Sequence, residues 1–527
     1  MDADKEARAD HAEAISVADN NLKGPGDGND APFTPEEEAK VLRKVDMIVM
    51  PLLWFGLIML QLDRGNMQVK ICTYQWMHTY QSIDSGNALT DNFLADVGID
   101  QNTLNVGQQL LQAAIVIFEI PSNLVLYRIG PTLWITLQIF AWGFVATFQA
   151  FQTNRASFLA TRFLLGAFEA GFQPAAFYTL SVWYKPSELS KRFGIFYSGN
   201  LFALALGGIV AYGILHMRGI SGMAGWQWLF IIEGILTLVV GATFGILFPA
   251  SPLQPRSLAR INLFTEEEQA VLQWRTLTTQ GSPDVHGEKK HITIKDFGKT
   301  VADPKLWPHL IVALFTFNAG IVYALYGPTI IASFGYEPLR ANALSSVGQW
   351  LSLILVIGGG YLADWWGRRG ILVVLYLSCT FITVLAFRLL PDNAPMGTKY
   401  AVLTLGIGTA LWSHPLNGSW LAVNARSPQD RAIRMALIVM GANLAGVMAP
   451  QLLRADDAPH YPRGWSILSA LTASALVLAI GLVVTYALLN ARTRKRDPAA
   501  ATDEPVGRRG VASANGFAVD GAHYYNY

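Results

Sequence analysis

The sequence predicts an all-α polytopic membrane protein, with twelve transmembrane helices in two pseudo-symmetric six-helix bundles. Hydrophobic residues make up 52% of the 527 residues and charged residues only 15%, a composition too apolar for a water-soluble protein of this length. Apolar windows long enough to cross a bilayer, about 20 residues each, recur along the chain. The longest polar break falls between the sixth window and the seventh, which indicates two sets of six.

The expected spans set the domain boundaries. They are residues 45–66, 104–126, 132–151, 157–183, 193–215, 227–249, 306–333, 341–363, 370–390, 400–424, 432–453 and 465–490. We therefore expect a cytosolic N-terminal tail with a short helix, an N-terminal bundle, a cytosolic linker, a C-terminal bundle and a disordered cytosolic tail. Their limits are residues 1–44, 45–249, 250–305, 306–490 and 491–527.

Two helix starts outside the membrane carry a capping signature. Thr34, followed by proline and then by Glu37, predicts a short helix that leads into the first span. Thr265 and Glu268 repeat this spacing inside the linker and predict a second helix there. The basic residues near the first span, in the linker and after the last span favour a cytosolic location for both termini and for the linker.

Composition also excludes several classes of function. The formal net charge of +1 gives no reason to expect a nucleic-acid partner. The two cysteines have no metal-ligand spacing, so neither a metal site nor a disulfide framework is expected, and no cofactor is expected either. The motifs of metalloproteases, serine hydrolases and P-loop enzymes do not occur at a plausible site, which argues against a membrane-embedded enzyme.

A charged segment, GGGYLADWWGRRG at residues 358–370, interrupts two long apolar runs. It falls at the junction of the eighth and ninth spans, where its charges can reach water. An aspartate at the C-terminal end of a helix meets an unfavourable dipole, so Asp364 should be held by Arg368, Arg369 or basic residues of another helix. Gly360 and Gly367 permit close packing and a sharp turn. A basic loop that only sets topology is the alternative interpretation.

The fourth span contains a polar stripe. At 100° per residue, Arg162, Gly166, Glu169 and Gln173 fall on one face of a helix, which we expect to line a central cavity. Arg162 is a permanent cation suited to a carboxylate substrate, and Glu169 is a carboxyl group that desolvation would make a proton carrier. A closed Arg162–Glu169 ion pair without a transport role is the alternative.

Further polar residues interrupt other apolar spans. Glu119, on the second span, is a second proposed proton carrier or else a packing contact between helices. The first span must continue through Asp63, Arg64 and Asn66 to cross the bilayer, unless these residues anchor its outer end. The predicted substrate-binding residues are Arg64, Asn66, Arg162, Gln173, Asn318, Tyr323, His414, Asn417 and Asn443, and the predicted proton-coupling residues are Asp63, Glu119 and Glu169.

Several motifs resemble those of one transporter family. The segment GYLADWWGRR resembles the loop signature of the major facilitator superfamily. The segments LDRGN, FEIPSNLVLYRIGP, TRFLLGAFEAGFQPAAF, GWQWLFIIEG and FPASP, which begin at residues 62, 118, 161, 225 and 248, resemble its fungal allantoate permease family. This resemblance implies alternating access in a monomer at the fungal plasma membrane. It also implies proton-coupled movement of small organic anions, with Asp364 and the arginines Arg368 and Arg369 latching the two halves.

The sequence departs from the family pattern after LDRGN. Residues 69–86 lie where such proteins run almost directly into the next segment, and we interpret them as a retained intron read in frame or as a long outer loop. Two functional alternatives also stay open. The same cavity could export a fungal secondary metabolite, or the protein could be a transporter-like nutrient receptor.

Overall fold

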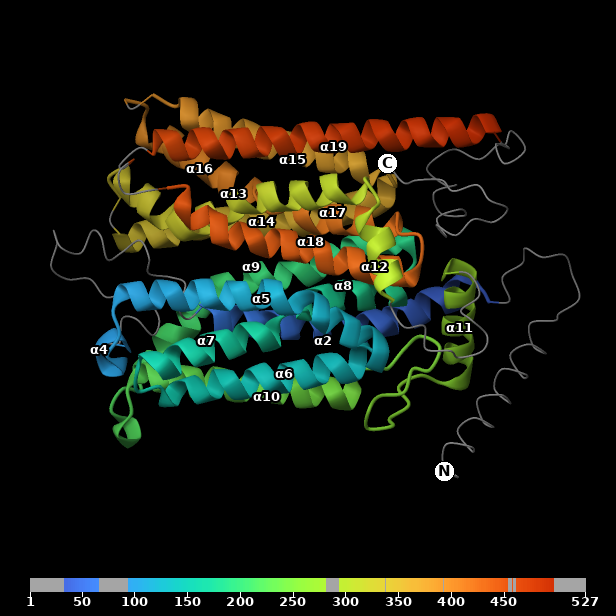
Figure 1. Cartoon of the computed structure of the whole chain (residues 1–527), viewed down its shortest axis with the longest axis horizontal. Coiled ribbons are helices and arrows are strands. Elements are labelled where there is room, and N and C mark those ends of the chain that lie inside the picture. The colour runs from blue at the N-terminus through green and yellow to red at the C-terminus, as the bar shows by residue number, and fades with distance from the viewer. Residues whose placement is uncertain are drawn as a thin grey trace, which may run out of the picture.

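The computed structural model describes residues 33–65, 93–280, 293–336, 338–391, 393–453, 457 and 461–496. Within these ranges the regular structure is helical, apart from one isolated bridge between Arg256 and Asn262. The long helices run roughly along one common axis (Figure 1). The predictions for Asn66 and for residues 69–86 lie outside the described residues.

Helices before the linker form one group, here called the N-half. They are α2 (Pro35–Gly65), α4 (Phe93–Val97), α5 (Gln101–Ile129), α6 (Pro131–Phe148), α7 (Arg155–Glu169), α8 (Phe172–Trp183), α9 (Leu189–Leu215) and α10 (Gly225–Leu247). Short 3-10 turns η1 (Gln149–Phe151), η2 (Pro186–Glu188) and η3 (Ile220–Gly222) connect some of them. Within the N-half, α10 packs on α6 and α2, and α5 packs on α7.

Helices after the linker form the C-half. They are α13 (Leu306–Ser333), α14 (Pro338–Trp366), α15 (Arg369–Leu389), α16 (Met396–Thr409), α17 (Ser413–Val423), α18 (Pro428–Met448), η4 (Ala449–Gln451) and α19 (Pro462–Arg496). Here α13 packs on α18 and α19, and α15 packs on α19. The two halves meet where α14 and α17 contact α9 and where α18 contacts α5 and α8.

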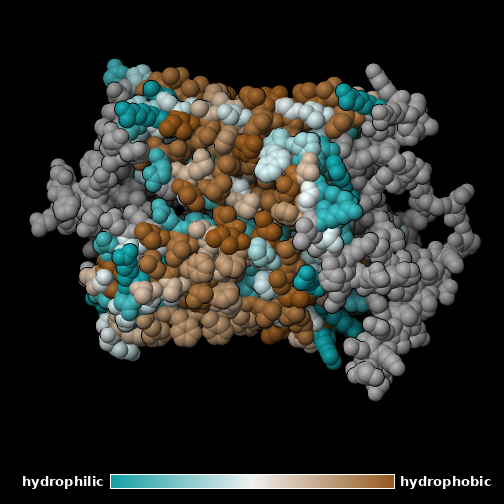
Figure 2. Space-filling view, viewed as in Figure 1, coloured by the Kyte–Doolittle hydropathy of each residue, from teal (hydrophilic) through white to brown (hydrophobic). Residues whose placement is uncertain are grey.

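Among the described residues, nine helices are long and apolar enough to cross a membrane. They correspond to nine of the twelve expected spans, and α9, with 27 residues, corresponds to the fifth. The fourth and tenth expected spans are each broken into two helices, so the prediction of a continuous helix there was wrong. Figure 2 shows hydrophobic side chains across the middle of the visible face and hydrophilic ones towards its two ends, as a bilayer requires.

Each break has a local cause. Between α7 and α8, Gly171 takes a φ of +87°, which a glycine adopts without steric cost. A Cβ on this glycine would also collide with the Ser122 side chain. Between α16 and α17, Pro415 has no N–H to continue the helical hydrogen bonds, so it is accommodated in the first turn of a new helix.

Both capping predictions are confirmed, but the first helix is longer than expected. The Thr34 and Thr265 amides donate to Glu37 and Glu268 over 2.8 and 2.9 Å, and each glutamate amide donates back to its threonine hydroxyl. Instead of a short helix followed by a span, Pro35–Gly65 is one continuous helix. Pro51 lies inside this helix and removes a single amide donor from its hydrogen-bond ladder, so the ladder continues on both sides.

The two ends of the molecule differ. At one end lie the start of α2, the end of α19 and the linker helices α11 (Glu266–Gln280) and α12 (Ile294–Val301) (Figure 1). We call this the linker end and the other the opposite end. Helix α11 contacts α2 of the N-half and α12 contacts α18 of the C-half, so each linker helix packs on a different half.

Candidate functional site

A cavity of about 300 Å³ lies between the two halves. Arg64 and Gln451 line it near the opposite end of the molecule, since Arg64 is the penultimate residue of α2 and Gln451 follows α18. The described lining residues are Gln61, Arg64, Gln108, Gln109, Gln112, Gln173, Asn200, Leu204, Phe317, Gly320, Ile321, Ala324, Leu411, Ala442, Asn443, Gly446, Val447 and Gln451.

The charged residue of the cavity wall is held from behind by a buried carboxylate. Arg64 donates from Nε to Glu169 Oε2 over 2.6 Å, and the glutamate side chain is fully buried. The other Glu169 oxygen has no hydrogen-bond partner among the described residues. Since the arginine side chain is only 9% exposed and the glutamate is not exposed at all, the ion pair is nearly excluded from water.

Arg162, which the sequence predicts as a substrate-binding residue, lies outside the described cavity lining. It is fully buried beside Gln149, to whose side-chain oxygen it donates, and its guanidinium lies 5.6 Å from the Phe158 ring centroid. Glu169 forms its ion pair with Arg64, and not with Arg162, among the described contacts. Arg162 interacts with Glu169 only electrostatically and does not appear among the described lining residues.

The polar stripe of the fourth span is also divided. Arg162, Gly166 and Glu169 share the buried face of α7, where a Cβ on Gly166 would collide with the Leu111 carbonyl of α5. Gln173 belongs to α8 and reaches the cavity from there. The break at residues 170–171 rotates the second helix relative to the first, so a single helical wheel does not describe both.

Glu119 connects the two halves. It is buried on α5 and accepts a hydrogen bond from Asn443 Nδ2 of α18, with a distance of 3.2 Å to Oε2. Asn443 lines the cavity, and Arg64 interacts electrostatically with Glu119. This carboxylate therefore lies at the junction of the cavity, the Arg64 ion pair and the interface between the halves.

Asp63, the third predicted proton carrier, faces the interior of the N-half. It is 3% exposed and accepts a hydrogen bond from Thr237 of α10 over 3.3 Å. Glu169 and Glu233 interact electrostatically with it. Asp63 therefore lies in a buried charged cluster with Glu169, Glu233 and Arg162.

Four predicted substrate-binding residues of the C-half are buried away from the described cavity lining. Asn417 accepts a hydrogen bond at 2.6 Å from the ring of His309, and Asn318 donates to the Leu314 carbonyl over 2.7 Å. Tyr323 packs with its ring centroid 5.7 Å from that of Trp465. These contacts are with neighbouring helices or with the residue's own helix.

His414, the fourth of these residues, lies in an aromatic layer between the halves. Its ring centroid is 5.5 Å from Tyr197 of α9 and 5.0 Å from Phe317 of α13. Phe317 also lines the cavity, whereas His414 and Tyr197 are fully buried. Phe317 is therefore the residue through which this aromatic layer reaches the cavity.

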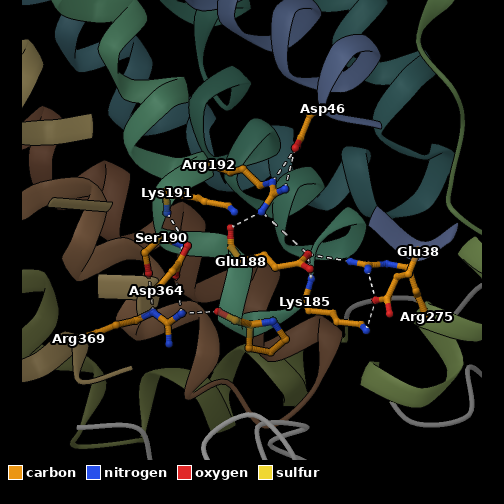
Figure 3. A network of polar contacts seen from close by, with 11 residues as sticks. Glu38, Asp46, Lys185, Glu188, Ser190, Lys191, Arg192, Arg275, Asp364 and Arg369 are labelled. Carbon is orange, nitrogen blue, oxygen red and sulfur yellow. Dashed lines mark hydrogen bonds and ion pairs between the residues drawn. The ribbon is translucent and has the colours of Figure 1, made fainter. Parts of the chain in front are cut away.

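A polar latch joins the halves at the linker end (Figure 3). Asp364 of α14 accepts hydrogen bonds from the backbone amides of Ser190 and Lys191, over 3.0 and 2.8 Å, at the start of α9. Arg369 forms an ion pair with Asp364 at 2.9 Å and donates to the carbonyl of Pro186. The dipole that disfavours the aspartate on its own helix is offset by the positive start of α9.

The glycines of the charged segment allow this close contact. A Cβ on Gly360 would lie 2.7 Å from the Lys191 Cα, so α14 could not approach α9 as closely with any other residue there. Gly367 has a φ of +71° in the turn to α15. Arg369, and not Arg368, forms the described ion pair with Asp364.

The latch continues into the N-half and the linker (Figure 3). Arg275 of α11 forms an ion pair with Glu188 at 2.7 Å and a second one with Glu38 of α2, which also pairs with Lys185. Arg192 pairs with Asp46 at 2.8 Å. Residues 185–191 are therefore held by the linker and α2 on one side and by the C-half on the other.

Several site residues were not predicted. Gln61 precedes Arg64 by one helical turn, and this spacing could have indicated it. Gln109, Asn200 and Gln451 are likewise polar lining residues without a motif. The backbone amides that hold Asp364 carry no side-chain signal, so they could not have been found from sequence.

Comparison with known proteins identifies the family. The family model for the Major Facilitator Superfamily matches residues 80–450. The chain belongs to the Major Facilitator Superfamily. It is 30% identical, over 86% of this chain and 81% of the other, to an uncharacterized transporter of Saccharomyces cerevisiae. By family membership, this protein is therefore a membrane transporter of small molecules.

Two further superfamily relatives are fungal. The MFS-type transporter cnsO of Penicillium expansum is 26% identical, over 88% of this chain and 86% of its own. The major facilitator-type transporter hxnP of Emericella nidulans is 25% identical, over 81% of each chain. Among solved structures, the superfamily transporter FucP shares the fold with a TM-score of 0.55 and 14% identity, over 82% of this chain and 98% of its own.

Proposed function

We propose that this superfamily member moves a small organic anion by alternating access, in symport with protons. The observation that carries the proposal is the Arg64–Glu169 ion pair, which places a permanent cation in the cavity wall with a buried carboxylate behind it. Small-molecule sites typically combine an apolar pocket with a few convergent polar groups, as this cavity does.

The ion pair links anion binding to protonation. While Glu169 is ionised, it competes with a substrate carboxylate for the Arg64 guanidinium. When Glu169 binds a proton, Arg64 is free to form a bidentate pair with the substrate. One proton and one anion then enter together, and the site stays electrically balanced while it is closed from water.

The same proposal covers the arrangement in the cell. The N-half and the C-half act as two rocking domains, with the linker and both termini in the cytosol and the cavity facing the outside. The resemblance to the fungal allantoate permease family supports a plasma-membrane monomer that takes up a nutrient anion. Under this orientation the latch closes the cytosolic side.

The test is a flux measurement in proteoliposomes with an acidic exterior. Wild-type protein should accumulate radiolabelled monocarboxylates against their gradient, whereas Glu169→Gln should exchange them between the two sides without accumulation. Loss of the proton dependence with exchange retained would identify Glu169 as the coupling residue. Retained binding and exchange show that the variant is folded. Accumulation that persists unchanged in Glu169→Gln would contradict the proposed coupling.

The same vesicles separate the alternatives. Accumulation that requires an acidic interior, the reverse of the gradient that drives symport, would identify an exporter of a metabolite. Substrate binding without any flux would identify a receptor.

A further inference from the structure

The two halves contribute chemically different walls to the cavity. Of the eight described lining residues from the N-half, seven are polar, and Leu204 is the exception. Of the ten from the C-half, eight are apolar, and Asn443 and Gln451 are the exceptions. A molecule that fills the space therefore touches amides and a guanidinium on one side and hydrocarbon on the other.

Charge is confined to one place in this lining. Arg64 is the one cation among the described lining residues, and it already faces a carboxylate. The C-half wall is formed by Phe317, Ile321, Leu411 and Val447 together with small residues of α13 and α18. An anionic group against that wall would lose its hydration without a cation to pair with.

We propose that the transported anion is an amphipathic monocarboxylate with an apolar body. Its carboxylate pairs with Arg64 of the N-half, and its hydrocarbon or aromatic body lies against the C-half wall around Phe317 and Ile321. The proposal rests on the proposed function and narrows it, because it excludes di- and tricarboxylates and polyhydroxylated acids as good substrates.

The amide side chains of the N-half fit the same orientation. Gln108, Gln112 and Gln173 line the same cavity as the arginine with groups that both donate and accept hydrogen bonds. One Gln108 nitrogen and one Gln112 oxygen are buried without a hydrogen-bond partner among the described residues. Polar atoms next to the substrate carboxylate can satisfy them, whereas the C-half wall offers a second polar end only the amides of Asn443 and Gln451.

Four related probes test the proposal by binding. They are phenylpropionate, its uncharged amide, phenylenediacetate with a second carboxylate at the far end of the ring, and gluconate with a hydroxylated body. Purified full-length protein should be stabilised against heat by phenylpropionate, since a ligand of the folded state raises the melting temperature. The other three should bind roughly tenfold or more weakly, as expected for a missing charge pair or a desolvated polar group.

A pair of variants tests the orientation. Val447→Thr adds a hydroxyl to the C-half wall with little change of shape, and it should lower the preference for phenylpropionate over gluconate several-fold. Val484→Thr, a half-exposed valine of α19 outside the described cavity lining, is the matched control and should leave the preference unchanged.

The outcomes separate this proposal from the proposed function. Phenylenediacetate or gluconate binding as tightly as phenylpropionate, in protein that still shows proton-driven uptake, would overturn the substrate class and leave the symport intact. Failure of phenylpropionate to bind at millimolar concentration would also overturn it. Selective binding of phenylpropionate without any proton-driven flux would support the substrate class and reject the symport.

Discussion

The Nε atom of Arg64 lies 2.6 Å from Oε2 of Glu169 and joins the end of α2 to the end of α7 at the wall of the cavity. Arg162, on α7 itself, is buried behind this pair and binds Gln149 instead. Arg64 and Arg162 therefore have different expected roles, one in anion binding and one in the structure of the bundle.

Replacing Arg64 should remove anion binding. We expect Arg64→Gln to weaken binding of a monocarboxylate roughly tenfold or more, because hydrogen bonds to charged groups contribute about 1.5 to 3 kcal/mol each. Isothermal calorimetry on the purified variant measures the change. Arg162→Gln is the matched control. Its folded fraction should retain affinity within about twofold, because Arg162 lies outside the described cavity lining. Equal losses in both variants would contradict the assignment.

Glu119 should contribute to coupling across the interface. In Glu119→Gln the side-chain carbonyl can still accept from Asn443, so the contact between the halves survives while the proton site is lost. We expect counterflow to be retained and proton-driven accumulation to fall, as measured in the same vesicles. Asn443→Ala removes the contact but keeps the carboxyl group, and it should leave the proton dependence in place. The reverse pattern would show that Glu119 serves only packing.

Loss of Asp364 should open the linker end. In Asp364→Asn, one of the two oxygens that accept from the Ser190 and Lys191 amides becomes a donor, so at least one hydrogen bond is lost. A cysteine introduced in place of Ala432 can report the opening, because Ala432 is buried where its carbonyl accepts from Asn123 of the other half.

This reporter substitution, Ala432→Cys, requires that both native cysteines are first replaced by serine. Labelling by an impermeant maleimide from the linker side should become roughly tenfold faster in Asp364→Asn, as expected for loss of about 1.4 kcal/mol or more from the closed state. Asp296→Asn, in the exposed cap of α12, is the control. Unchanged labelling in Asp364→Asn would reject the latch.

The linker helix should set the strength of this latch. Arg275 holds Glu188, next to the segment that binds Asp364, so Arg275→Gln should raise labelling of the same reporter severalfold. Arg275→Lys should restore part of the effect. Lys44→Gln is a matched control. It breaks the 2.5 Å ion pair between Lys44 of α2 and Glu268 of α11 and leaves the contacts of residues 185–191 in place. A similar increase in Lys44→Gln would show a general effect of loosening α11.

One buried carboxylate at the linker end should make stability depend on acid pH. Burial raises the pKa of Asp303, but the hydrogen bond and charge of Arg434, 2.7 Å away, outweigh it and hold the pKa below its usual value. A depressed pKa means that the stabilisation is complete above the unfolded-state pKa, about 3.9. It is lost only as the pH falls through the lower pKa of the folded state.

Asp303→Asn should therefore lower the melting temperature at neutral pH by several degrees, because breaking a buried pair costs about 3 to 5 kcal/mol. The difference between wild type and variant should begin to shrink below about pH 4, where the unfolded chain takes up a proton, and it should vanish below the lower pKa of the folded state, where the wild-type carboxyl group is neutral as well. Thermal unfolding of the detergent-solubilised protein over a pH series measures it. A difference that stays constant down to the lowest pH would contradict the assignment.

The sequence determined the elements because their signals are local. Apolar length is set by bilayer thickness, so ten of the twelve expected spans appear as single long helices, and the capping pairs at Thr34 and Thr265 form where their spacing predicts. Gly171 and Pro415 were also visible in the sequence. The length of an apolar run does not show that the backbone breaks inside it, so these two residues alone do not predict the breaks.

The tertiary structure decided the partners. Glu169 could have paired with Arg162, seven residues away on its own helix, but it pairs with Arg64 at the end of α2 instead. Asp364 is bound chiefly by backbone amides at the start of another helix, and Gly360 allows that approach. Helical periodicity fixes only which face a side chain occupies. The contact it makes depends on how distant helices cross, and that follows from the packing of the whole bundle.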